Sequence, residues 1–190
     1  MLCLKAPLPP GSLQTIWGDD NRFINAYFFK NNTSYFYKTF DFAEIDNEGY
    51  YYMLGRTDDV INVAGHRIGT RELEEALQLH ERVAETAVIG VQDKIKGQVP
   101  LAFIVKKEIA DFSESDDNTL REELDALITE ELGRFAKPKQ MHFVPNLPKT
   151  RSGKLLRRAL QAICERRDPG DLTTIEDNNV LEPIKKLFNF

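Results

Sequence analysis

Two apolar runs separated by a short polar stretch constrain the fold of this chain more than any other feature. Residues 84–91 and 99–105 are rich in apolar and β-branched side chains, and the mostly polar residues 92–97 lie between them. Runs of this length and composition, bounded by turn-forming residues, are typical of β-strands. We therefore predict two strands here.

Helical periodicity appears in the sequence both before and after these two predicted strands. Apolar residues at helical spacing form one stripe in each of three segments: Leu73, Ala76 and Leu77; Leu120, Leu124, Leu127 and Ile128; Leu156, Ala159, Leu160 and Ile163. Residues 140–144 indicate a further strand. Strand and helix thus alternate between about residues 57 and 167. This pattern predicts the α+β class: a small two-layer domain with a short, mainly antiparallel sheet flanked by helices.

The first part of the chain has a different character. Residues 1–54 are rich in Phe, Tyr and turn-forming residues, with strand-like runs at 35–42 and 50–54 and a hairpin turn at 46–49. A few short strands cannot bury enough apolar surface to offset the loss of chain entropy. We therefore interpret residues 1–57 as the β-rich tail of a larger, missing N-terminal domain, and residues 58–190 as a second domain with a C-terminal tail.

Composition excludes several classes of protein. The chain is 42% hydrophobic and 29% charged, which predicts an ordinary globular protein. Its net charge of −5 argues against a general nucleic-acid binder. Cys3 and Cys164 are far apart, so neither a disulfide framework nor a zinc site is indicated. The sequence contains no apolar run of membrane-spanning length and no signal peptide, so we expect no membrane association and a cytoplasmic location.

Two polar motifs suggest chemistry on a phosphate-bearing substrate. Residues 55–70 hold two arginines, two aspartates and three glycines, and residues 149–154 place Lys154 directly after a Ser-Gly pair. A lysine ammonium on a mobile tip suits phosphate oxygens, although such a lysine is often only a solvated loop residue. Asp41, at the end of a predicted strand, is placed to accept ribose hydroxyls or to stabilise a turn. Arg56 offers a second ribose contact or a weak surface ion pair.

The two motifs carry a family resemblance. Residues 147–158, Leu-Pro-Lys-Thr-Arg-Ser-Gly-Lys-Leu-Leu-Arg-Arg, resemble the catalytic-lysine motif of the adenylate-forming superfamily. Residues 55–67, with 8–11 and 17–23, resemble the short-chain branch of the AMP-forming acyl-CoA synthetases. One departure is Phe40, which stands before Asp41 where the family usually has glycine. The resemblance covers nearly the whole chain, which would be the C-terminal part of such an enzyme.

The resemblance implies a role for each candidate residue. Lys154 would act in adenylation, the Ala64–Gly65 segment would face the pantetheine arm of CoA, and Asp58 would be the hinge between two domain poses, although it could equally be a helix N-cap. Asp41, Arg56 and Arg67 would contact the nucleotide. His80, with the carbonyls of Gln78 and Val83, corresponds to a cation-binding position of some relatives. His66 is more readily structural than catalytic.

The implied reaction has two steps. A short-chain carboxylate and ATP, with Mg²⁺, give acyl-adenylate, and CoA then displaces AMP. Residues 96–100 and the Thr-Phe-Asp string favour propionate over acetate. Because the glycine-rich ATP loop is absent from the sequence, the fragment alone should be inactive and bind none of these ligands tightly. Lys154 would also be a target for a lysine acetyltransferase and a deacylase. Two alternatives remain open: the lid of another adenylate-forming ligase, and a noncatalytic CoA- or protein-binding remnant.

Overall fold

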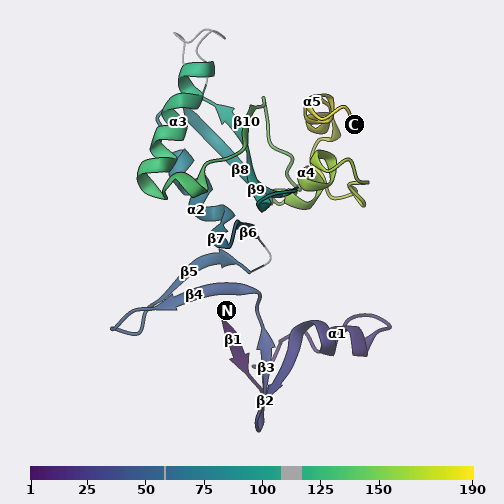
Figure 1. Ribbon diagram of the computed structural model, residues 1–190. Helices are drawn as coiled ribbons and strands as arrows, with labels where there is room; N and C mark the ends of the chain where they lie inside the picture. Colours follow the sequence, from purple (N-terminus) through teal and green to yellow (C-terminus); the bar gives the residue numbers. More distant parts are fainter. Residues whose placement is uncertain (58, 108–116) are drawn as a thin grey trace. The chain divides into compact units, whose positions relative to one another are not determined.

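The computed structural model describes residues 1–57, 59–107 and 117–190, and its chain divides into two units, Met1–Asp58 and Asp59–Phe190. Figure 1 shows the elements of each unit along the sequence. The two units differ in how much of their apolar surface they bury. We describe each by itself.

Unit 1 consists of short antiparallel sheets and one helix (Figure 1). Strands β1 (Cys3–Lys5), β3 (Ser34–Lys38) and β2 (Phe28–Asn31) form a three-stranded sheet in that order, and helix α1 (Asp20–Tyr27) leads directly into β2. The side chain of Asp19 caps α1 by accepting a hydrogen bond from the Arg22 N–H at 2.9 Å. This cap satisfies one of the amide groups that a helix start leaves unpaired.

The second sheet of unit 1 is the predicted hairpin. Strands β4 (Asp41–Ile45) and β5 (Tyr51–Arg56) pair antiparallel, and Asp46 closes the turn by accepting hydrogen bonds from the N–H groups of Glu48 and Tyr50. The hairpin is therefore confirmed. The single strand-like run at 35–42 is instead two strands of two sheets, because Phe40 takes a positive φ of 63° between β3 and β4. A side chain in this left-handed conformation interrupts an extended strand.

The sheet of unit 2 is built around two long strands. Strand β9 (Gly97–Lys106) pairs antiparallel with β8 (Val83–Asp93) along its length. On its other edge, β9 pairs parallel with β10 (Gln140–Phe143) and meets β6 (Val60–Val63) at Gly97. Strand β7 (His66–Gly69) completes the sheet by pairing antiparallel with β6. The strands predicted at 84–91, 99–105 and 140–144 are confirmed, and the sheet is mainly antiparallel.

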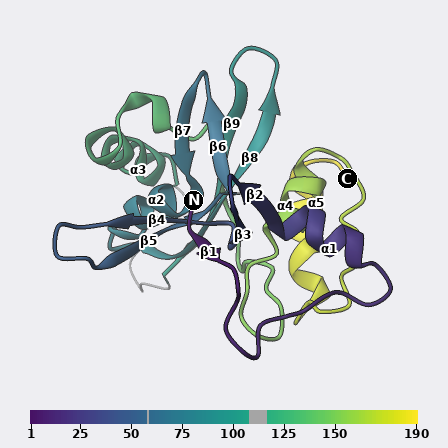
Figure 2. The same ribbon diagram turned by 90° about the horizontal axis from the view of Figure 1, so that it is seen from below.

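Helices pack on both faces of this sheet (Figure 2). Helices α2 (Thr70–Gln78) and α3 (Asp117–Glu131) cover one face, and α4 (Arg157–Cys164) and α5 (Leu181–Leu187) cover the other. Because side chains of a strand alternate between faces, Ala102 and Ile104 of β9 join the first core cluster while Leu101 and Phe103 join the second. The α+β class is confirmed, with one helical layer more than the two layers expected.

Two 3-10 turns, η2 (Arg134–Ala136) and η3 (Asn178–Val180), precede β10 and α5. Among the described residues, no helix has the length and apolar character needed to cross a membrane.

Candidate functional site

Lys154 lies on a tight loop closed by its own hydrogen bonds. The Thr150 N–H donates to the Lys154 carbonyl at 2.8 Å, and the Gly153 N–H donates to the Thr150 carbonyl at 2.8 Å. The Thr150 hydroxyl also accepts from the Lys154 N–H at 3.1 Å. Gly153 takes a φ of +81°, a conformation that favours glycine. The sequence therefore forms a closed loop that presents an exposed lysine, whose ammonium has no ion-pair partner among the described residues.

Ion pairs connect the two ends of this loop to the sheet and to α2. Before the loop, the Lys149 ammonium lies 2.7 Å from a carboxylate oxygen of Glu85 on β8. After the loop, the Arg157 guanidinium contacts both carboxylate oxygens of Glu74 on α2, at 2.9 and 2.7 Å. These charged contacts fix the loop ends relative to the core, since charge-assisted and two-point hydrogen bonds are the stronger kinds.

Glu74 is a buried carboxylate that the sequence did not reveal. Its side chain is 10% exposed and also accepts a hydrogen bond from the Val88 N–H at 2.8 Å. Burial raises the pKa of Glu74, while the Val88 N–H and the Arg157 guanidinium oppose this rise. Glu74 and Arg157 are 83 positions apart, so no local spacing signals the pair.

Ala64 and Gly65 form the tight turn between β6 and β7. Their φ angles are 50° and 92°, as a two-residue hairpin turn of this hand requires. The Asn62 side chain accepts a hydrogen bond from the Gly65 N–H at 3.0 Å, and the Ala64 N–H donates to the Lys96 carbonyl at 2.9 Å. The turn is thus held both by its own strand and by the β8–β9 turn. A Cβ at Gly65 would meet no atom within 4 Å, so the backbone there is open to an approaching group.

Arg67 follows on β7 and is exposed, opposite Asn62 in the ladder. The structure therefore gathers Ala64, Gly65 and Arg67 on one hairpin. Lys154 stands on a separate loop of the same unit, between β10 and α4. Preceding Arg67, His66 stacks on Phe135 with ring centroids 4.5 Å apart, a packing role that agrees with the structural interpretation of His66.

Asp41 and Arg56 come together in unit 1. They face each other in the β4–β5 ladder, with a guanidinium nitrogen 3.7 Å from a carboxylate oxygen. Phe40, which occupies the usual glycine position, keeps the positive φ that glycine would take. Its ring packs edge-on against Tyr27 at 5.7 Å. The departure from glycine therefore leaves the backbone before Asp41 in a glycine-like conformation, at a cost of about 1 kcal/mol of strain.

Asp58 and His80 are the two remaining candidates from the sequence. Asp58 lies outside the described residues. Both ring nitrogens of His80 are engaged: Nδ1 accepts from the Arg82 N–H at 3.2 Å, and Nε2 lies 3.2 Å from the Glu123 carboxylate. A cation at His80 would have to displace one of these partners. Among the described residues, no three His, Cys, Asp or Glu side chains gather as a metal site would need.

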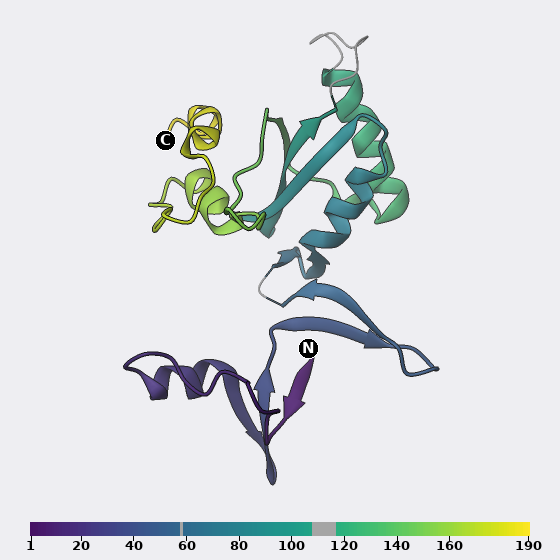
Figure 3. The same cartoon turned by 180° about the vertical axis from the view of Figure 1, so that it is seen from behind.

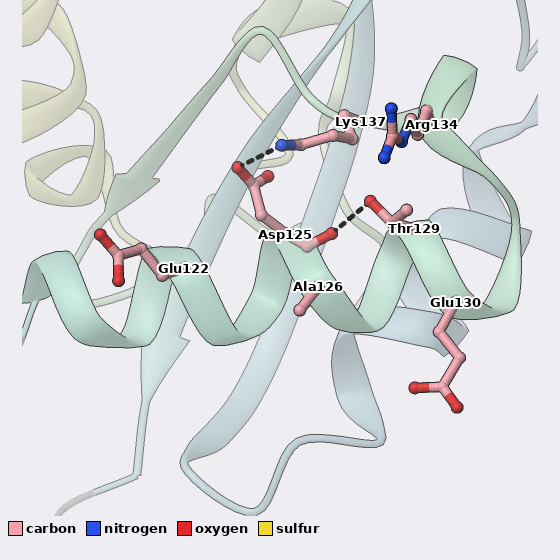
Figure 4. Close-up of a pocket in the computed structure, with 7 residues that line it drawn as sticks. All are labelled: Glu122, Asp125, Ala126, Thr129, Glu130, Arg134 and Lys137. Carbon is pink, nitrogen blue, oxygen red and sulfur yellow. Dashed lines mark hydrogen bonds and ion pairs between the residues drawn. The ribbon is translucent and has the colours of Figure 1, made fainter.

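A hollow of about 720 Å³ along α3 contains none of the sequence candidates (Figure 4). Asp125 and Lys137 point toward each other in it, 2.9 Å apart, and the Thr129 hydroxyl donates to the Asp125 carbonyl at 2.7 Å. Its charged groups of both signs largely face solvent. The candidate residues that remain are the two turns bearing Gly65 and Lys154 in unit 2 and, separately, the Asp41–Arg56 pair in unit 1.

Comparison with known proteins places this geometry in a family. Residues 72–154 match the AMP-binding enzyme C-terminal domain. The chain is 52% identical over 98% of its length to the propionate–CoA ligase of Salmonella typhimurium, and 43% identical over 98% to the acetyl-coenzyme A synthetase of Helicobacter pylori, covering 30% and 28% of those proteins. The chain thus spans about a third of the length of these curated relatives.

A solved structure shows the same fold. The ATP-bound RpMatB-BxBclM chimera B1 superposes with a TM-score of 0.67 at 29% identity, over 78% of this chain and 28% of that one. The matched range ends at Lys154, within the loop that carries this lysine. Residues 72–154 therefore carry the C-terminal domain of AMP-binding enzymes.

Proposed function

We propose that this chain is the C-terminal part of an AMP-forming ligase that joins a short-chain carboxylate to CoA. The observation that carries the proposal is the closed loop of residues 149–155, which presents Lys154 without an ion-pair partner among the described residues. The carboxylate and ATP would give acyl-adenylate and pyrophosphate, and CoA would then displace AMP. ATP and CoA would be substrates of the whole enzyme, and Mg²⁺ would accompany ATP. We propose a cytoplasmic location, because the cytoplasm contains both substrates.

Lys154 would act by electrostatics in the first step. Charge builds up on the transferring phosphate, and an ammonium held at that position stabilises it without forming a covalent bond. The loop supports this role because its backbone is closed while the lysine side chain is exposed. A fixed loop with a movable ammonium can approach a substrate held by another domain.

The β6–β7 turn suits the second step. CoA carries a long pantetheine arm that needs a backbone it can lie against, and the open side of Gly65 offers one. Arg67 on the same hairpin would approach the nucleotide phosphate, since a guanidinium binds phosphate oxygens at two points. Asp41, oriented by Arg56, would accept the ribose hydroxyls. Asp58 as hinge and His80 as a cation site belong to the proposal on the family resemblance alone.

The function can be tested by grafting. This chain would replace the matching C-terminal region of the Salmonella propionate–CoA ligase, and both half reactions would be measured separately. Lys154→Ala should reduce adenylation by about 100-fold or more, while thioester formation from preformed acyl-adenylate is kept. Lys186→Ala, which removes another exposed lysine of the same unit, is the matched control. An inactive graft, or equal loss of both steps in Lys154→Ala, would contradict the proposal.

The preferred carboxylate and the noncatalytic alternative have tests of their own. Identity is higher to the propionate–CoA ligase than to the acetyl-coenzyme A synthetase, so we propose propionate as the preferred acid. Because the graft keeps the parent's domain that holds the substrate, the preference is tested on the native enzyme, in which turnover with acetate above that with propionate would count against it. A noncatalytic remnant would bind CoA or protein yet give an inactive graft.

The exposure of Lys154 also supports regulation by acylation. Acetylation removes the ammonium charge and would stop adenylation while leaving the fold intact. Mass spectrometry of the protein from cells grown on acetate or propionate tests this. Absence of modified Lys154 under both conditions would oppose a role for an acetyltransferase and a deacylase.

A further inference from the structure

The C-terminal segment returns to pair with the loop that carries Lys154. The Arg151 N–H donates to the Thr174 carbonyl at 3.1 Å, and the Glu176 N–H donates to the Lys149 carbonyl at 2.9 Å. Thr150 and Ile175 form an antiparallel bridge between these two bonds. Three successive loop residues are therefore paired with three successive residues of a segment that lies beyond the matched family domain, which ends at residue 154.

These bonds make residues 148–151 the middle strand of a small ladder. On one edge, the Thr150 N–H bonds the Lys154 carbonyl at 2.8 Å and the Leu156 N–H bonds the Pro148 carbonyl at 3.0 Å. On the other edge lie the two bonds to residues 174–176. Successive residues of an extended strand direct their backbone groups to opposite edges, as here. The position of Lys154 thus depends on a strand that the C-terminal segment holds from its far side.

The C-terminal segment is itself fixed to the sheet. Ile175 is 4% exposed and belongs to the second core cluster, with Leu160 of α4. Leu181 and Ile184 of α5 are fully buried in the same cluster. Figure 3 shows this segment, in yellow, beside α4. Ile175 before residue 176 and Leu181 after it are both buried in the core. The ladder therefore connects the Lys154 loop to the core of unit 2.

We propose that residues 174–176 are a positioning element for adenylation, with the Glu176 N–H and the Ile175 side chain as its positioning groups. The proposal rests on the function proposed above for Lys154. Without the outer bonds, the strand at 148–151 would be supported on one edge only, and the Lys154 loop would sample more positions. Misplacement of a reacting group by about 1 Å costs up to about 100-fold in rate, so even a modest loosening should be measurable.

Two substitutions at one exposed position isolate the hydrogen bond. Glu176→Pro removes the N–H donor, and Glu176→Ala removes only the side chain. Ile175 forms an antiparallel bridge, and the extended backbone typical of a bridge suits the restriction that a following proline imposes. In the 190-residue chain, hydrogen exchange of the Thr150, Gly153 and Lys154 amides should be about tenfold faster in Glu176→Pro than in Glu176→Ala, with β9 equally protected in both. Equal exchange at the loop in the two variants would overturn the ladder as its support.

The second readout separates positioning from folding. In the grafted ligase, Glu176→Pro should lower the kcat of adenylation about tenfold relative to Glu176→Ala, with the KM for ATP changed by less than about twofold. Thioester formation from preformed acyl-adenylate should not differ between the variants. Parallel loss in both half reactions would overturn the positioning role and leave a structural one.

A milder variant covers the case in which Glu176→Pro does not fold. Ile175→Val deletes one methyl group from the anchor and should shift loop exchange and adenylation in the same direction, by about twofold to threefold. No change in either would count against the proposal. If the graft of the unsubstituted chain is inactive, both the proposed function and the positioning role fail. The hydrogen-exchange experiment still tests whether residues 174–176 support the loop.

Discussion

The two units of this molecule differ in how they treat their apolar side chains. Among the described residues, Phe23 is the one buried hydrophobic side chain of unit 1, whereas unit 2 buries two clusters, one on each face of its sheet. Most of the large exposed hydrophobic residues belong to unit 1: Met1, Leu4, Leu13, Trp17, Ile24, Phe29, Tyr35, Ile45, Tyr50, Tyr51, Tyr52, Met53 and Leu54. Apolar side chains thus form a core in one unit and an apolar surface in the other.

The difference follows from the length of the paired strands and from the helices that cover them. Unit 2 pairs two long strands and covers both faces with helices, so each apolar side chain meets several neighbours. Unit 1 pairs strands of three to six residues, and its own hollow of about 710 Å³ is lined mainly by apolar residues such as Leu8, Leu13 and Phe23. Apolar area buried is the main source of folding free energy, so unit 2 should be much the more stable.

The largest expected effect is a contrast in amide protection. Amides of β8 and β9 should exchange at least about 1,000-fold more slowly than those of β1, β2 and β3, because global unfolding of unit 2 costs several kcal/mol and opening of unit 1 costs little. Hydrogen exchange along the chain, read by mass spectrometry, measures both at once. Strongest protection before residue 35 would break the comparison.

Truncation of a core ring should come next. Phe103→Ala, at a fully buried position of β9, should lower the unfolding free energy of unit 2 by about 3 to 5 kcal/mol. Phe36→Ala removes a half-buried ring that stacks on Phe29 in unit 1 and serves as the control. Denaturant titration followed by circular dichroism should show the main transition shifted only by the first. A comparable shift from Phe36→Ala would indicate that the units unfold together.

Removal of the buried carboxylate should have a smaller effect. Glu74→Ala leaves Arg157 without the carboxylate it contacts at two points and the Val88 N–H without its acceptor, so we expect a loss of about 2 to 4 kcal/mol. Its neighbour Glu75 is exposed and pairs with Arg71 on the surface, so Glu75→Ala should cost less than about 0.5 kcal/mol. Similar denaturation midpoints for the two variants would refute the buried pair as a contributor to stability.

The smallest effect concerns acid. His142 of β10 lies between the rings of Phe103 and Phe188, and its Nε2 is buried without a hydrogen-bond partner among the described residues. Burial, and then the positive charge of Arg121, lower the pKa of His142 from its ordinary 6.5. Below about pH 6.5 the unfolded chain therefore binds more protons than the folded one, and stability should fall as the pH drops.

The change should be the smallest of these effects, because it involves the protonation of one side chain whose ring is partly exposed. His142→Phe should flatten the dependence of the unfolding free energy on pH between 7.5 and 5.5. The same slope in the variant would assign it to other groups.

The sequence predicted the parts of the fold that local patterns determine. The β8 and β9 strands, the α3 and α4 stripes and the 46–49 turn each depend on neighbours within a few positions. The break at Phe40 was missed, because a bulky residue at positive φ has no signal in composition. The second helical layer was also missed, since periodicity shows that a helix has an apolar side and does not show which face of a sheet it meets.

Among the candidate residues, too, local patterns were predictable and distant contacts were not. Lys154 and Gly65 lie in short strings whose turns include hydrogen bonds between near neighbours, and such strings can be recognised in the sequence. The Glu74–Arg157 pair and the bonds from residues 174–176 were not, because their partners are distant in sequence and, in the ladder, are backbone groups. Tertiary contacts of this kind become visible only once the sheet has brought the segments together.

The ladder beside Lys154 has a consequence for how the chain can change over time. Its two outer bonds use main-chain N–H and carbonyl groups, which every residue possesses, apart from the N–H that proline lacks. Substitutions at Thr174 or Glu176, other than proline at position 176, can therefore accumulate during evolution while the backbone pairing with the Lys154 loop is kept. Two descendants of this chain could differ at positions 174 and 176 and still hold the lysine in the same place.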